Sequence, residues 1–262
     1  MDYKSIEFSV EEHVASLVLS RPDRANVINL ELAQELMAAS IECDENPDIR
    51  AVLIRAKGPM FCGGGDLKTF VKRDDDLPAY LKQTTTYLHA AVSRLTRQDA
   101  PVICAVQGFA AGGGFSLAIS GDIVLASQSA KFTMAYTKAG LTPDGSSTYF
   151  LPRLVGLRRA MDLALTNRVL SADEAVEWGL ASRVTPDEDL VSEAEAVARK
   201  LAGGATWALG AAKRLLHGGF NESLETQLEM ETRAIADSVR THDGREGIRA
   251  FVEKRRPAFT GA

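Results

Sequence analysis

Two glycine-rich runs contain the residues of this 262-residue chain that are best suited to chemistry. Residues 61–66 are Phe-Cys-Gly-Gly-Gly-Asp, and residues 108–114 are Gly-Phe-Ala-Ala-Gly-Gly-Gly. Glycine-rich turns leave backbone N–H groups free for a ligand, and a helix that begins there adds the positive end of its dipole. Two such turns on neighbouring strands would aim two N–H groups at one oxygen atom, which is the geometry of an oxyanion hole.

The spacing of these glycines excludes two common nucleotide-binding motifs. It does not exclude a purely structural role for the glycines. Neither run has the G-x-G-x-x-G spacing of dinucleotide-binding turns, and neither is a G-x-x-x-x-G-K-[ST] phosphate loop. Glycine also permits tight turns and close packing without binding any ligand.

The segments around the two runs predict strands and helices in alternation. Continuous apolar segments at 51–54 and 102–106 are typical of strands buried on both faces. Alternating apolar residues over 6–19 predict a β-hairpin, and Asn29 is placed to cap a helix over 30–43. This order favours βαβ units and an α/β fold. The other predicted elements are strands at 123–126 and 131–133, and helices at 79–97, 157–165, 172–178, 190–201, 207–217, 223–238 and 245–254.

Composition and charge narrow the class of protein. The net charge is −5, and 45% of residues are hydrophobic and 25% charged, which is the balance of a folded globular protein and argues against a basic nucleic-acid binder. Three cysteines and four histidines lack metal-ligand spacing, so we expect free thiols and no metal site. The first residues show no secretory signal, and glycines interrupt the apolar stretch 102–119, so we expect a cytoplasmic protein without a membrane span.

Several motifs together carry a resemblance to a known family. Residues 61–67 and 108–114, with Arg21-Pro22, Pro101-Val102 and the terminal Phe-Val-Glu-Lys-Arg at 251–255, resemble the enoyl-CoA hydratase/isomerase (crotonase) superfamily. The resemblance implies a spiral of ββα units over residues 1–200. It also implies a C-terminal helical region over 201–262 that supports homotrimers or hexamers made of two trimers.

The same resemblance implies the ligand. It is the thioester of an acyl-CoA substrate, and no covalently bound cofactor or metal is implied. The thioester oxygen would lie between the N–H groups of Gly65 and Gly113, flanked by Gly64 and Gly112. One such donor is worth about 3 kcal/mol of barrier.

The acidic residues indicate which reaction to expect. Hydratases of this family use two glutamates, and the matching positions here are Ser116 and Tyr136. Hydration by two glutamates is therefore not expected. Asp144 is the one acid left in the right neighbourhood, where the sequence alone favours a helix cap and the family implies an acid/base or a nucleophile.

The motifs most resemble the epoxyphenylacetyl-CoA isomerase group of the family, over 129–136, 141–144, 151–153 and 245–261. Members of that group also move the double bonds of enoyl-CoA esters. The resemblance makes Asp144 the group that carries the proton, and it puts Tyr136 at the substrate.

Two other functions stay open. An aryl-CoA dehalogenase of the 4-chlorobenzoyl-CoA type would use Asp144 as nucleophile and His89 as the base for water, although those enzymes carry Trp where Tyr136 stands. A non-catalytic relative that binds acyl-CoA or RNA would also lack the two glutamates.

The phosphates of CoA need local cations, because the net charge of −5 cannot attract an anion from a distance. The family places Arg24, Lys68 and Lys254 near the nucleotide, with Lys254 reaching a neighbouring subunit. Asp66 is assigned to the same site, and it is also placed to cap a short helix. Each cation could equally be a solvated surface side chain.

Overall fold

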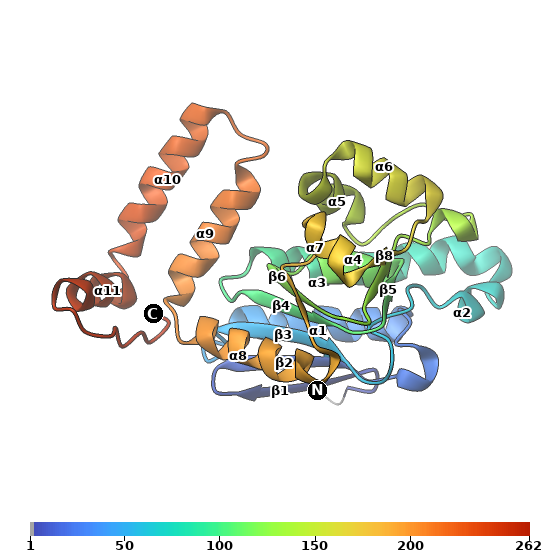
Figure 1. The fold of residues 1–262 in the computed structure, drawn as a ribbon, viewed down its shortest axis with the longest axis horizontal. Coiled ribbons are helices and arrows are strands. Elements are labelled where there is room, and N and C mark those ends of the chain that lie inside the picture. Colours follow the sequence, from blue (N-terminus) through green and yellow to red (C-terminus); the bar gives the residue numbers. More distant parts are fainter. Residues whose placement is uncertain (1–2) are drawn as a thin grey trace.

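Six strands form the main sheet of the computed structural model, which describes residues 3–262. The first pair is antiparallel and every other neighbouring pair is parallel. A second sheet of three short strands lies beside it (Figure 1). The main sheet runs in the order β1 (Ile6–Glu11), β2 (Val14–Leu19), β3 (Ala51–Ala56), β4 (Val102–Val106), β6 (Ile123–Ser127) and β9 (Arg183–Thr185), and the second in the order β5 (Phe109–Ala111), β7 (Lys131–Thr133) and β8 (Leu170–Ser171).

Helices follow most of the strands, and the predicted caps begin two of them. The Asn29 side chain accepts a hydrogen bond from Leu32 N, and that of Asp66 accepts one from Thr69 N. Each cap satisfies an N–H group that has no partner within its own helix. The helices are α1 (Leu30–Glu45), α2 (Leu67–Val71), α3 (Leu77–Arg97), α4 (Gly113–Ile119), α5 (Ser147–Val155), α6 (Leu157–Thr166), α7 (Ala172–Glu177), α8 (Leu190–Ala202), α9 (Thr206–Gly218), α10 (Leu224–Ser238) and α11 (His242–Val252).

The central strands β3 and β4 of the main sheet are buried on both faces over most of their length, which explains their continuous apolar sequences. Successive side chains of a strand point to opposite faces. Val52 and Ile54 of β3 belong to the core cluster built with α1, α3 and α4. Ala51 and Leu53 belong to a second cluster, which α8 covers with Leu190 and three alanines.

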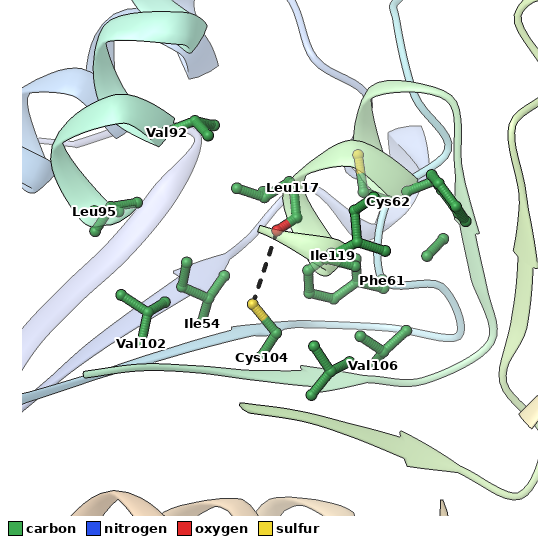
Figure 2. Close-up of a cluster of buried hydrophobic side chains, with 14 of the residues drawn as sticks. Ile54, Phe61, Cys62, Val92, Leu95, Val102, Cys104, Val106, Leu117 and Ile119 are labelled. Atoms are coloured by element: carbon green, nitrogen blue, oxygen red, sulfur yellow. Dashed lines mark hydrogen bonds between the residues drawn. The ribbon is translucent and has the colours of Figure 1, made fainter. Parts of the chain in front are cut away.

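The two glycine-rich runs leave the same edge of the sheet and pair with each other. β3 and β4 are parallel neighbours, so their carboxyl ends lie side by side. Cys62 N donates to Phe109 O at 3.1 Å, and Ala111 N donates to Cys62 O at 3.0 Å. Figure 2 shows Phe61 and Cys62 in one apolar cluster with Leu117 of α4. The first run is thereby held against the second run and its helix.

The structure confirms the predicted hairpin and the strands at 51–54, 102–106, 123–126 and 131–133. It also confirms the predicted helices, whose ends differ from the predicted ends by three residues or fewer. Three very short strands, β5, β8 and β9, were not predicted. The apolar stretch 102–119 forms β4, β5 and α4. Among the described residues, no helix is long and apolar enough to cross a membrane.

Gly114→Ala tests how tightly the two runs are packed. A Cβ atom at Gly114 would lie 2.5 Å from Cys62 Cβ and 2.8 Å from Cys62 Sγ, closer than atoms can pack. We expect a loss of about 1–3 kcal/mol in the free energy of unfolding, measured by urea denaturation. Gly203→Ala is the control, since its added Cβ would meet only ordinary contacts at 3.5 Å. Equal stability of the two variants would contradict the packing.

Candidate active site

Both glycine-rich runs line one cavity of about 280 Å³. Gly65 and Gly113 form part of its wall, together with Tyr136 and Asp144. Most of the remaining wall is apolar and comes from the segments around α1, α2 and α3. These wall residues include Ile28, Leu67, Phe70, Leu81, Leu88 and Leu141. The cavity therefore brings backbone donors and one carboxylate into an apolar surrounding, as ligand sites commonly do.

The backbone N–H groups of Gly65 and Gly113 take no part in the hydrogen bonds of the strands and helix around them. In the bridge between Ile28 and Gly65, Ile28 N donates to Gly64 O at 2.7 Å and Asp66 N donates to Ile28 O at 3.0 Å. That pattern leaves the N–H of Gly65 outside the pairing. Gly113 is the first residue of α4, so its N–H has no acceptor within the helix. Both groups can therefore serve a ligand oxygen.

The neighbouring glycines are needed for the backbone itself. Gly64 has φ +93°, and a Cβ there would lie 2.8 Å from Ala111 O. Gly112, with φ +52° and ψ −124°, lies against Gly64 and is the N-cap residue of α4. Only glycine adopts these angles at little cost. Gly64 and Gly112 thus let the two runs approach each other at the cavity.

Asp144 is held by a chain of hydroxyl groups. The Tyr136 hydroxyl donates to Asp144 Oδ1 at 2.6 Å, and Ser116 Oγ lies 2.9 Å from the same hydroxyl. Ser116 is fully buried, and its Oγ lies equally close to Asp144 O, at 2.9 Å, so its one proton is available to either the Tyr136 hydroxyl or that carbonyl. The two positions that match the glutamates of hydratases are thus in contact with each other, and Tyr136 contacts the remaining acid.

The helix-cap role that the sequence alone favours for Asp144 is wrong. Helix α5 begins at Ser147, and its N-cap residue is Ser146, which makes no side-chain cap bond. The Asp144 carboxylate bonds to Tyr136 instead, while the Asp144 carbonyl accepts from Ser147 N and Oγ. The backbone of Asp144 therefore serves the helix, and its carboxylate faces the cavity.

Tyr136 stays protonated and acts as a donor. Burial and the neighbouring Asp144 carboxylate raise the pKa of Tyr136 well above its ordinary value of 10. Cys62, the thiol of the first run, is also neutral, because burial raises its pKa to about 12. Its Sγ donates to Asn26 O at 3.1 Å. A thiolate nucleophile at the first run is therefore excluded.

His89 lies on the other side of Asp144. Its Nε2 accepts a hydrogen bond from Gly145 N at 3.1 Å. His89 and Asp144 both line a larger cleft of about 730 Å³ between α3, α5 and α9. Because Nε2 is used as an acceptor, the ring proton of neutral His89 is on Nδ1.

The expected CoA-binding side chains lie at different places on the molecule. Arg24 lies in the turn before α1 and is exposed. Lys68 lies in α2 and is also exposed. Lys254 is exposed beyond α11, at the opposite end of the molecule from α2 (Figure 1). Asp66 is buried, and its carboxylate bonds to Thr69 N and Oγ1, so it caps α2 and is not part of the cavity wall.

The sequence did not reveal which residues of α3 face the cavity. Leu81, Thr84, Thr85 and Leu88 line it, and their spacing fits one face of the predicted helix, but nothing in that spacing distinguishes a cavity wall from core. Within residues 3–262, no three His, Cys, Asp or Glu side chains gather as a metal site would need.

Comparisons with known proteins place the chain among acyl-CoA enzymes. A sequence profile described as enoyl-CoA hydratase/isomerase matches residues 9–262. The chain is 41% identical over 253 residues to the 1,2-epoxyphenylacetyl-CoA isomerase of Escherichia coli K12, covering 96% of this chain and 97% of that protein. It is 33% identical over 227 residues to 4-chlorobenzoyl coenzyme A dehalogenase-2 of Arthrobacter sp, covering 86% and 82%. The crystal structure of an enoyl-CoA hydratase from Polaromonas sp. JS666 has a TM-score of 0.93 and 33% identity, covering 97% and 99%.

These similarities confirm the predicted resemblance, including that to epoxyphenylacetyl-CoA isomerase, and the predicted fold. The relatives carry the names of an isomerase, a dehalogenase and a hydratase, and one fold can support all three reactions. The chain belongs to the enoyl-CoA hydratase/isomerase family and has its crotonase fold.

Proposed function

We propose that this protein is an acyl-CoA isomerase in which Asp144 moves a proton while the N–H groups of Gly65 and Gly113 hold the thioester oxygen. One observation carries the proposal: Gly65 and Gly113, whose N–H groups donate to no described residue, line the same cavity as Asp144. The name of the 41% identical relative, an epoxyphenylacetyl-CoA isomerase, adds support. The substrate is an enoyl-CoA or a ring-epoxide phenylacetyl-CoA.

For an enoyl-CoA the proposed reaction has two proton transfers. The Asp144 carboxylate removes a proton from the carbon next to the thioester carbonyl, and the electron pair of the broken C–H bond forms a dienolate. The negative charge collects on the thioester oxygen, where each N–H donor is worth about 3 kcal/mol. Protonated Asp144 then returns the proton two carbons along, so only the double bond has moved.

Tyr136 acts as a positioning residue in this proposal. Its hydroxyl donates a hydrogen bond to Asp144 Oδ1. No side chain or backbone group of the described residues donates to Oδ2, which leaves that oxygen free for the substrate proton. A carboxylate held in this way presents one basic oxygen in one orientation. Ser116 fixes the Tyr136 hydroxyl in turn.

Hydration is less well supported than isomerisation. Adding water needs a group that activates the water as well as one that moves a proton at carbon. The two positions that match the glutamates of hydratases are Ser116 and Tyr136, and they are hydrogen-bonded to each other. One carboxylate is enough for an isomerase.

Subunit association and CoA binding complete the proposal. The helices beyond residue 205 project from the core (Figure 1) and expose large apolar side chains, which favours a homotrimer or hexamer. Lys254 would then reach the CoA of a neighbouring subunit, while Arg24 and Lys68 serve their own subunit. The exposed apolar residues include Leu216, Phe220, Leu224, Ile235, Phe251 and Val252.

The proposal also includes how the chain is divided into regions and in which cellular compartment the protein works. We divide the chain into a core over 1–200 and a C-terminal helical region over 201–262. We also place the protein in the cytoplasm, which suits its three buried free thiols.

A dehalogenase is the second candidate, because His89 and Asp144 share one cleft and the chain is 33% identical to such an enzyme. A base for water needs a free acceptor, however, and His89 Nε2 is bonded to Gly145 N. Chloride release from 4-chlorobenzoyl-CoA that is lost in His89→Gln would favour this candidate over the isomerase.

Asp144→Asn tests the proposed proton carrier. We expect isomerisation of 3-enoyl-CoA esters to fall about 10²- to 10⁴-fold, because the amide cannot accept the proton. Binding of acyl-CoA should persist, because Asn Oδ1 can still accept from Tyr136. Turnover is followed by the absorbance of the conjugated product.

Full activity of Asp144→Asn would overturn the proposed mechanism. Wild-type protein that binds acyl-CoA but turns over none of a panel of enoyl, ring-epoxide and halobenzoyl esters would favour the non-catalytic relative. Efficient addition of water by the wild type would favour a hydratase.

Tyr136→Phe tests the positioning role. We expect kcat to fall about 10- to 100-fold with little change in KM, because a hydrogen bond to a charged group is lost.

Tyr80→Phe is the matched control for Tyr136→Phe. Tyr80 is a buried tyrosine whose hydroxyl accepts from Leu30 N at 3.1 Å, away from Asp144. The positioning role is wrong if the two variants have the same kcat, or if Tyr136→Phe changes KM as much as it changes kcat.

A further inference from the structure

The hydroxyl of Thr84 is a buried polar group without a partner. Thr84 lies in the middle of α3 and is only 4% exposed. No described residue accepts from or donates to its Oγ1. An unsatisfied buried hydroxyl costs about 1–3 kcal/mol, so such groups call for a physical reason.

Other threonines of the same helix do not share this property. Thr85 Oγ1 donates to Leu81 O at 2.8 Å, Thr86 Oγ1 to Lys82 O at 2.7 Å, and Thr96 Oγ1 to Val92 O at 2.8 Å. This bond to the preceding turn is the usual solution for threonine in a helix. Thr84 lies in the same helix, but its hydroxyl does not donate to a carbonyl oxygen of the preceding turn.

Thr84 also lies in the wall of the candidate active-site cavity. Leu81 and Leu88, its neighbours on the same face of α3, and Phe70 of α2 make that part of the wall apolar. The thioester end of a ligand belongs to Gly65, Gly113 and Asp144 in the proposed function. The α3 wall is then left for the rest of the acyl group.

We propose that Thr84 is a specificity-determining residue, and that the preferred substrates are acyl-CoA thioesters whose acyl group carries an oxygen atom that accepts a hydrogen bond from Thr84. This inference rests on the proposed function for the orientation of the ligand. Threonine in a helix has two accessible χ1 rotamers, so rotation about one bond directs the hydroxyl to a ligand. An ether, epoxide or hydroxyl oxygen would each satisfy it.

The test compares ligands that differ by one atom. Cyclohexylacetyl-CoA is paired with the three tetrahydropyranyl-acetyl-CoA isomers, in which a ring oxygen replaces the CH₂ at position 2, 3 or 4. Dissociation constants are measured by calorimetry, so that no turnover is needed. We expect at least one oxygen isomer to lose about 5- to 10-fold in affinity, relative to cyclohexylacetyl-CoA, on Thr84→Val.

Thr85→Val is the matched control, because Thr85 lines the same cavity with its hydroxyl already bonded to Leu81 O. Thr84→Ser keeps the hydroxyl and should keep the preference. The unliganded Thr84→Val protein should be as stable as the wild type or more so, because an unsatisfied polar group has been replaced by a methyl of the same shape.

The proposal is wrong if Thr84→Val and Thr85→Val change the ratio of affinities equally, or if Thr84→Val alone destabilises the unliganded protein. Failure of the proposed function looks different: the oxygen preference is measured by binding, so it can be present in a protein that catalyses no isomerisation. Absence of binding to all four ligands would overturn both.

Discussion

The site depends on the backbone pairing between the two glycine-rich runs. β3 and β4 are parallel neighbours, and their carboxyl ends deliver both runs to one edge of the sheet. There Cys62 pairs with Ala110, and Gly114 lies so close to Cys62 that no side chain fits between them. This contact fixes the distance between two turns that are about fifty residues apart in the chain. Gly65 and Gly113 then line one cavity, and the bridge from Gly65 to Ile28 and the start of α4 at Gly113 leave the N–H group of each without a partner among the described residues.

The carboxylate of Asp144, the proposed proton carrier, depends on the second glycine-rich run as well. α4 begins at the second run and carries Ser116, whose Oγ lies 2.9 Å from both the Tyr136 hydroxyl and the Asp144 carbonyl oxygen. The helix that provides one N–H group therefore also positions the carboxylate. Ser116 and Tyr136 stand at the positions where the family resemblance implies the glutamates of hydratases. The structure therefore holds one acid and two hydroxyl groups at this place, and the proposed proton transfer needs only one acid.

The elements could be predicted from sequence wherever a repeated local pattern was long enough. Apolar runs identified β3 and β4, and side chains of the right type identified the caps at Asn29 and Asp66. The cap assigned to Asp144 was wrong because its carboxylate is bonded to a tyrosine eight residues earlier, across a turn that no local pattern describes. The sequence also could not predict that the Thr84 hydroxyl lacks a partner, because Thr84 and Thr85 are neighbouring threonines that differ only in their contacts in the folded chain. Local propensity therefore defined the scaffold, while contacts between segments defined the chemistry.

The most direct test of the central claim is the infrared stretch of the thioester carbonyl in a bound, saturated acyl-CoA labelled with carbon-13 at that carbon. Two N–H donors on one oxygen weaken the C=O bond, so the account predicts a lower frequency in the complex than in free acyl-CoA. The same shift should persist in Asp144→Asn, because that substitution leaves both glycines unchanged. A frequency equal to that of free acyl-CoA in water, in a complex shown to be saturated, would contradict the account.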